Sequence, residues 1–144
     1  MELITFEVAG QLFGLDIMAI REIRAWTPAT RLPQVPPFVV GVVNLRGTVL
    51  PVIDLAARLG WPSTEATPRH AIIVVQLGGQ TMGLIVEAVS DIVALADDAL
   101  QPPPDTGNVD VVPFLRGLAG LGDRMVMVLD LDRLGTAEHL ETAA

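Results

Sequence analysis

Apolar and polar residues alternate along most of this chain in short runs that are typical of β-strands. In residues 3–8, LITFEV, the even-numbered positions are all apolar and fall on one face. Residues 71–77, AIIVVQL, form a second apolar run. Ala9-Gly10 and Gly78-Gly79 follow these runs directly, and such pairs supply the positive φ that a two-residue hairpin requires. The pattern therefore predicts a β-hairpin at both places.

The same order of elements is expected twice. After each hairpin the pattern predicts a third strand, a loop rich in proline, and two further strands joined by a tight turn. These turns are expected near Arg46-Gly47 and near Gly122-Asp123. Each series ends in a short helical cap that begins at Asp54 or Asp130, because an Asp side chain accepts hydrogen bonds from the free amides of a helix start.

Two blocks of the sequence match two later blocks. Residues 9–23 align with 78–92 at an offset of 69, with six identical residues. Residues 37–55 align with 113–131 at an offset of 76, with seven identical residues. Because both blocks align in the same order, we infer an internal duplication of a unit of about 65 residues.

Five short strands in each unit predict a small closed barrel, since closure removes the exposed edges of a flat sheet. A unit of this size alone buries little apolar surface. The last strands, residues 48–53 and 124–129, are apolar on both faces. This pattern indicates one face inside a barrel and the other against the second unit.

We therefore predict an all-β fold of two fused five-stranded β-barrel subdomains with short helical caps. The expected division of the single domain, residues 1–144, is a first subdomain at about 3–60, a second at about 70–135, and a tail at 136–144.

The composition argues against several classes of function. A net charge of −8 and the absence of Tyr are unfavourable for binding nucleic acid. The longest uncharged run, residues 71–86, is shorter than the roughly 20 apolar residues of a membrane-spanning helix, so we expect no direct membrane insertion. The absence of Cys excludes a disulfide framework and fits a reducing compartment. We expect a cytoplasmic protein.

Candidate catalytic residues are scarce. The histidines are His70 and His139, and Ser63 and Ser90 have no base nearby in the sequence. No G-x-S-x-G motif is present. Residues 130–132, DLD, lack the spacing of a calcium loop and are interpreted as a helix cap. We expect no cofactor, no metal and no enzymatic activity.

A single cation, Arg46, interrupts the hydrophobic stretch GVVNLRGTVLPVIDL at residues 41–55. One interpretation is a solvated charge at the tip of a hairpin. The other is a binding contact, because an Arg held by flanking strands amid apolar surface resembles an interface hot spot. The second unit has Gly122-Asp123 at this site, so the hairpin does not require an Arg. This comparison favours a role for Asn44 and Arg46 that is specific to the first unit.

The stretch VGVVNLRGTVLPVIDL, preceded by IMAIREI and TRLPQVPPF and followed by GLAGLGDRMVMVLDL, resembles the CheW family of bacterial chemotaxis coupling proteins. The likeness runs in order from about Leu3 to Leu134. Members of that family have two five-stranded barrels of SH3-like type. The resemblance implies a non-catalytic adaptor that links the cytoplasmic hairpin tips of chemoreceptors (methyl-accepting chemotaxis proteins) to the histidine kinase CheA in receptor arrays.

The resemblance also implies a receptor-binding surface in the groove between the barrels. Carried onto this chain, that surface consists of Ile20, Glu22, Gly41, Val42, Asn44, Arg46 and Gly47. The regulatory domain of the kinase is implied to pack against barrel ends, and no residues of this chain are assigned to it. Two features depart from the family pattern. The helical cap has Ala56 after DL and its cation at Arg58, and the loop at 60–70 shows no recognised motif.

Two alternatives remain open. One is a CheW-like domain of a larger signalling protein, such as the kinase or a receiver-fused coupling protein; Met1, two residues before the first strand, favours a free-standing chain. The other is an enzyme or a small-ligand-binding barrel that uses the groove. The lack of a base and of convergent polar residues disfavours it, and a thermal-shift panel of small molecules separates it from an adaptor.

Overall fold

The computed structural model describes residues 1–62, 67–77, 79–103 and 111–134, and the expected tail at 136–144 lies outside them. The strands are β1 (Glu2–Val8), β2 (Gln11–Asp16), β3 (Ile20–Ala25), β4 (Val39–Leu45), β5 (Thr48–Asp54), β6 (Ala71–Leu77), β7 (Gln80–Val86), β8 (Ala88–Ala94), β9 (Leu115–Leu121) and β10 (Arg124–Leu129). The helices are the 3-10 turns η1 (Ile17–Ala19) and η2 (Val112–Phe114) and the single-turn α1 (Leu55–Arg58) and α2 (Leu131–Leu134). The predicted all-β class is confirmed. Every helix of the described chain is too short to cross a lipid bilayer.

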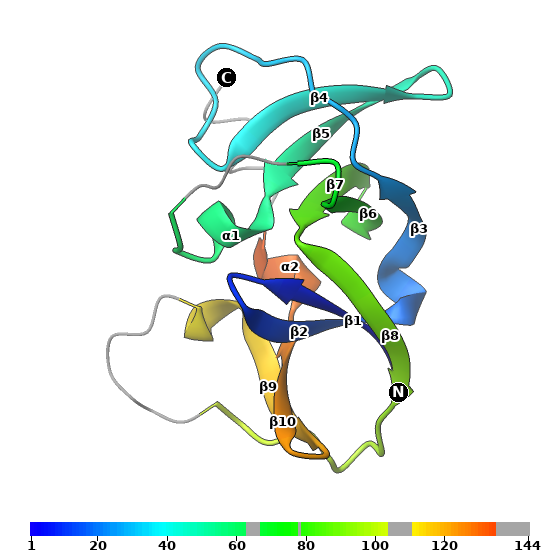
Figure 1. Cartoon of the computed structure of the whole chain (residues 1–144), viewed down its shortest axis with the longest axis vertical. Coiled ribbons are helices and arrows are strands. Elements are labelled where there is room, and N and C mark those ends of the chain that lie inside the picture. Colours follow the sequence, from blue (N-terminus) through cyan, green and yellow to red (C-terminus); the bar gives the residue numbers. More distant parts are fainter. Residues whose placement is uncertain (63–66, 78, 104–110, 135–144) are drawn as a thin grey trace.

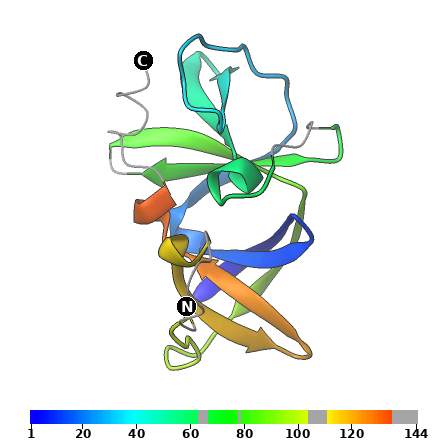
Figure 2. The same cartoon turned by 90° about the vertical axis from the view of Figure 1, so that its left-hand side faces the viewer.

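The strands form two five-stranded sheets of SH3-like type. We call the sheet of order β8-β1-β2-β10-β9 barrel A and the sheet of order β3-β6-β7-β5-β4 barrel B. Barrel B occupies the upper half of Figure 1 and barrel A the lower half. In Figure 2 the cyan hairpin of β4 and β5 and the yellow-orange hairpin of β9 and β10 lie at opposite ends of the molecule.

Each barrel contains strands from both repeats. The β1–β2 hairpin of the first repeat joins β8, β9 and β10 of the second, while the β6–β7 hairpin joins β3, β4 and β5 of the first. The barrels therefore do not coincide with the predicted ranges 3–60 and 70–135. The two hairpins have equivalent apolar patterns, so the pattern alone does not decide which barrel each one enters.

Parallel pairing joins each exchanged hairpin to the other repeat. β5 pairs with β7 over Val52–Asp54, and β10 pairs with β2 over Met127–Val128. The strands β5 and β10 thus lie where the repeats meet. Their predicted burial on both faces holds only in part, because Val49 is 64% exposed and Met125 is 58% exposed.

The largest core lies between the barrels, not inside either of them. It includes Phe6 and Phe13, whose rings stack with centroids 6.2 Å apart, together with Ile53 of β5 and Leu129 of β10. Two smaller apolar clusters fill the barrel interiors. Because the hairpins β1–β2 and β6–β7 contribute to both kinds of core, the two barrels share their apolar packing.

An isolated β-bridge completes each barrel. After β3 the chain returns so that Thr30 exchanges two hydrogen bonds of 2.8 Å with β4, and after β8 Gln101 does the same with β9. A Cβ atom on Gly41 would lie 2.1 Å from the Thr30 carbonyl oxygen. A Cβ atom on Gly117 would lie 2.9 Å from that of Gln101. Close approach of the returning chain thus explains why both repeats carry glycine at this position.

The helical caps begin as predicted. Asp54 Oδ1 accepts a hydrogen bond from the Ala56 amide at 3.1 Å, and Asp130 Oδ1 accepts one from the Asp132 amide at 3.1 Å. Both caps follow the strands β5 and β10 directly, so they lie near the level at which the barrels meet (Figure 1).

Arg58, the cation that departs from the family pattern, lies where the repeats meet. Its guanidinium carbon is 4.9 Å from the ring centroid of Phe38 and 4.5 Å from that of Phe114, which are equivalent positions of the two repeats. Arg58 Nε donates a hydrogen bond to the carbonyl oxygen of Leu134 on α2. Burial lowers the pKa of Arg58 below its ordinary value, yet an arginine remains charged at neutral pH.

Candidate functional site

The β4–β5 hairpin ends in a turn that is unusual for an arginine. Arg46 has a φ of 51° and Gly47 a φ of 85°, as in a type I′ turn, which favours Asn-Gly at these positions. Asn44 Oδ1 accepts a hydrogen bond from the Gly47 amide at 2.9 Å and so supports the turn. In the second repeat Gly122, with a φ of 61°, occupies the first turn position. Arg46 therefore stands where glycine would cost less free energy.

The Arg46 side chain reaches strand β3. Its Nη2 donates to Glu22 Oε1 at 2.9 Å, and Arg24 Nη1 lies 3.8 Å from Glu22 Oε2. The Arg46 side chain is 71% exposed and that of Glu22 is 26% exposed. An ion pair with one exposed member adds little stability, typically less than about 1 kcal/mol. The structure thus brings two predicted site residues together and leaves the guanidinium accessible to a partner.

The remaining predicted residues occupy different places. Ile20 begins β3 and packs, partly buried, against the core between the barrels. Gly41 and Val42 lie on β4 at the closing bridge, where Val42 exchanges two hydrogen bonds of 2.8 Å with the loop after β3. Neither of these two lines the hollow around Glu22 and Arg46. Their positions give Gly41 and Val42 a part in closing barrel B.

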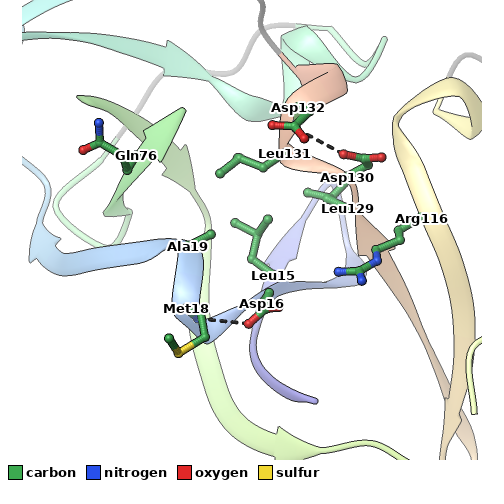
Figure 3. Close-up of a pocket in the computed structure, with 10 residues that line it drawn as sticks. All are labelled: Leu15, Asp16, Met18, Ala19, Gln76, Arg116, Leu129, Asp130, Leu131 and Asp132. Carbon is green, nitrogen blue, oxygen red and sulfur yellow. Dashed lines mark hydrogen bonds between the residues drawn. The ribbon is translucent and has the colours of Figure 1, made fainter. Parts of the chain in front are cut away.

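Two adjoining hollows form a groove beside these residues. One, of about 370 Å³, surrounds the Glu22–Arg46 pair between β3, the β4–β5 turn, β6 and β7. The other, of about 510 Å³, lies at the junction of the barrels and is drawn in Figure 3. Gln76 of β6 lines both hollows, so they are neighbours. We call the two together the inter-barrel groove.

The part of the groove in Figure 3 combines apolar and charged groups. Leu15 and Leu131 lie near its centre, and Met18 of η1, 88% exposed, lies at its edge. Three aspartates and Arg116 surround them. Two of these carboxylates also bond the backbone, since Asp16 accepts from the Met18 amide at 3.0 Å and Asp130 caps α2. This part of the groove is mainly polar, with charges of both signs around a few apolar side chains.

Two groove residues, Arg21 and Gln76, and Arg24 beside the groove were not part of the sequence prediction. Arg24 shares Glu22 with Arg46, and Arg21 Nη2 donates to Gln76 Oε1 at 3.1 Å. The alternation of β3 could have indicated Arg24, because Arg24 is two residues from Glu22 and residues two apart on a strand share a face. No signal in the sequence placed Gln76, which comes from the other repeat.

Polar groups in the interior have structural partners. Of the described residues, the buried polar side chains are Thr5 and Asp54. Thr5 Oγ1 bonds the backbone of Asp91 at 3.1 Å, and Asp54 caps α1. Among the same residues, no group of three or more His, Asp or Glu side chains is placed to hold a metal ion.

Comparisons with known proteins give a consistent result. A family model described as a CheW-like domain matches residues 2–139. The chain is 47% identical over 142 residues to the chemotaxis protein CheW of Rhizobium meliloti (strain 1021), covering 99% of this chain and 92% of that protein. It is 31% identical over 139 residues to the chemotaxis protein CheW of Klebsiella aerogenes, covering 96% and 84%. The crystal structure of the scaffolding protein TtCheW from Thermoanaerobacter tengcongensis matches with a TM-score of 0.85 at 33% identity, covering 96% of this chain and 89% of that one.

Proposed function

The chain belongs to the CheW-like family, and from this premise we propose that it is a chemotaxis scaffold that couples chemoreceptors to a CheA-type histidine kinase. The cytoplasmic hairpin tip of a receptor docks in the inter-barrel groove, and the regulatory domain of the kinase binds a separate surface. The protein acts in the cytoplasm, attached to receptor arrays through these partners.

The observation that carries this proposal is the placement of Arg46. An L-residue with a long side chain at a φ of 51° costs about 1 kcal/mol relative to glycine, and the ion pair with Glu22 regains only part of it. Folding therefore does not account for an arginine at this turn. A binding partner does, because the exposed guanidinium lines the inter-barrel groove, and grooves are common docking sites for helices.

Candidate contacts for the kinase lie on both barrels. Apolar side chains are exposed in equivalent pairs, one member on each barrel: Ile23 at 41% with Ile92 at 53%, and Val49 at 64% with Met125 at 58%. Exposed apolar side chains outside the groove are candidates for protein contacts. We expect Met125→Lys to weaken kinase binding and to leave receptor binding unchanged, as measured by co-purification with each partner.

The scaffold is proposed to have no catalytic activity of its own. The purified protein should turn over no ATP, yet it should change the activity of a CheA-type kinase when a receptor is present. ATP hydrolysis that copurifies with the chain through several chromatographic steps would contradict this part of the proposal.

Arg46→Ala tests the docking site. Loss of an interface arginine is expected to weaken receptor-tip binding by about 2 kcal/mol, some thirtyfold, with kinase binding retained. The free energy of unfolding should change by no more than about 0.5 kcal/mol. Arg46→Glu should weaken receptor binding further if the partner presents a carboxylate at this point.

Arg124→Ala is the matched control. Arg124 follows the equivalent turn of the second repeat, its side chain is 50% exposed, and its Nη2 lies 3.5 Å from Glu7 Oε1. It therefore resembles Arg46 in exposure and pairing but lies on barrel A. We expect receptor binding of this variant to equal that of the wild type. If Arg46→Ala keeps its receptor affinity but loses stability, Arg46 is a structural residue and the docking proposal is wrong.

A further inference from the structure

The duplication provides an internal comparison between the interiors of the two barrels. In barrel A the Leu95 amide donates to the Met1 carbonyl at 2.8 Å, and in barrel B the Trp26 amide donates to the His70 carbonyl at 3.3 Å. These bonds identify equivalent positions in the two barrels, at the same offset of 69 that aligns Val93 with Arg24.

The equivalent positions differ in character. In barrel A, the side chains of Met1, Val93 and Leu95 pack into the interior apolar cluster. In barrel B the corresponding residues are His70, Arg24 and Trp26. Within the described residues, the interior cluster of barrel B includes none of these three. Barrel A is therefore filled here by apolar side chains, whereas barrel B has an exposed Arg24 and partly buried Trp26 and His70 at the equivalent positions.

A cavity remains in barrel B at this place. It has a volume of about 40 Å³ and is lined by Leu45, Leu50, Ile72 and Val74 of the interior. Arg24, Thr27 and Asn44, all exposed, stand at its opening between the edge strands β3 and β4. A single water needs roughly 15 Å³ of such volume, so the cavity has room for a branched aliphatic group. We call this opening, with its apolar lining residues, to which Val43 also belongs, the mouth of barrel B.

The mouth lies in the one strongly basic stretch of an acidic chain. Residues 17–53 contain four arginines and a single glutamate, a net charge of +3, whereas the whole chain carries −8. Arg24 stands at the mouth and Arg46 at the groove, and Glu22 lies between them. Charge complementarity therefore favours an acidic occupant.

We propose that the mouth of barrel B binds one aliphatic side chain presented by an acidic segment of the docked partner. This inference rests on the proposed function, because Glu22 links Arg24 at the mouth to Arg46 in the groove, and the segment then belongs to the receptor tip. The partner's carboxylates pair with Arg24 and Arg46, and its aliphatic side chain supplies the plug that Met1, Val93 and Leu95 supply in barrel A.

Methyl NMR of the full chain tests the proposal. The probe is a blocked pentapeptide with one leucine between two pairs of glutamates, and the reference peptide has alanine in place of leucine. We expect saturable shifts of the methyl signals of Leu45, Leu50, Ile72 and Val74. The methyl signals of Leu3 and Val126, inside barrel A, should not shift. The alanine peptide should bind at least about tenfold more weakly, because it buries less apolar surface.

Arg24→Val places in barrel B the residue that barrel A has at the equivalent position. This variant is expected to melt at a higher temperature than the wild type and to lose the methyl shifts with the leucine peptide. Shifts that are equal for both peptides, or leucine-peptide binding by Arg24→Val as tight as that of the wild type, would overturn the proposal. If the variant does not fold, the comparison of the two peptides on the wild type still decides.

A titration with a receptor tip separates this inference from the proposed function. If the tip binds through Arg46 but leaves the mouth methyl signals unshifted, the inference fails and the docking proposal stands. If the leucine peptide fills the mouth but no receptor tip binds, the docking proposal fails and the mouth remains a site for an acidic segment.

Discussion

At the scale of single residues, Arg46 carries a conflict between folding and binding. Its backbone has a positive φ of 51°, and the residue at the first turn position of the second repeat, with a φ of 61°, is a glycine. Its side chain meanwhile pairs with Glu22 at the groove. A residue that is suboptimal for its turn and placed at a groove is typical of a functional position.

The conflict predicts that Arg46→Gly is more stable than the wild type. Relief of the left-handed strain should exceed the loss of the exposed ion pair, so the free energy of unfolding should rise by about 0.5 kcal/mol. Gly122→Ala is the converse change and should lower it by about 1 kcal/mol. Urea denaturation of both variants measures the difference. A destabilised Arg46→Gly would mean that the ion pair outweighs the strain.

Arg58 shows a residue with the opposite balance. Its guanidinium contacts two aromatic rings and a carbonyl of α2, all near the meeting of the repeats. Arg58→Ala should therefore lower the free energy of unfolding by about 2 kcal/mol. Arg133→Ala, at a side chain that is 60% exposed, should change it by less than about 0.5 kcal/mol. Equal melting temperatures for the two variants would show that Arg58 does not hold the repeats together.

At the scale of elements, the closing bridges explain the glycines of β4 and β9. In Gly41→Ala the new Cβ would meet the Thr30 carbonyl at 2.1 Å, so the loop or the strand must move. We expect a loss of about 3 kcal/mol of stability. Gly117→Ala, with 2.9 Å to the Gln101 carbonyl, should cost about 1 kcal/mol. Thermal unfolding of both variants checks the order; a milder effect at Gly41 would contradict the bridge geometry.

The strands and turns were predictable from the sequence, but the exchange of the β1–β2 and β6–β7 hairpins between the barrels was not. Apolar patterns predict strands such as β1 and β6, and the Ala9-Gly10 pair predicts the turn after β1. The two hairpins, however, have identical residues at equivalent positions, such as Gly14 and Gly83 or Leu15 and Leu84. Their apolar pattern therefore fits either barrel. Only the course of the connecting chain decides between them.

The candidate site was predictable to a similar degree. The repeat identified Asn44 and Arg46 as residues specific to one turn, and the structure pairs Arg46 with Glu22. The pairing itself depends on the approach of β3 to the β4–β5 turn, which no local pattern reports. The resemblance grouped Gly41 and Val42 with the same surface, but their positions at the closing bridge depend on the loop after β3.

At the scale of the whole molecule, the exchanged hairpins couple the stability of the barrels. Val126 is fully buried inside barrel A, and Val126→Ala should cost about 2 kcal/mol. The strands β6 and β7 share the core between the barrels with β1 and β2. In Val126→Ala we therefore expect amides of β7 in barrel B to exchange with solvent about thirtyfold faster than in the wild type. Hydrogen exchange read by NMR measures this. Unchanged exchange in β7 would mean that the barrels unfold independently.

The exchange of hairpins has a consequence for the symmetry of the molecule. Two identical half-length chains that swapped hairpins in this way would form a symmetric pair and would display every surface residue twice. A single chain that contains both halves is free of that restriction. It carries Arg46 at one turn and Asp123 at the equivalent turn of the other half. The two ends of the molecule therefore carry different surface residues. An assembly built from it has a direction that a symmetric pair cannot supply.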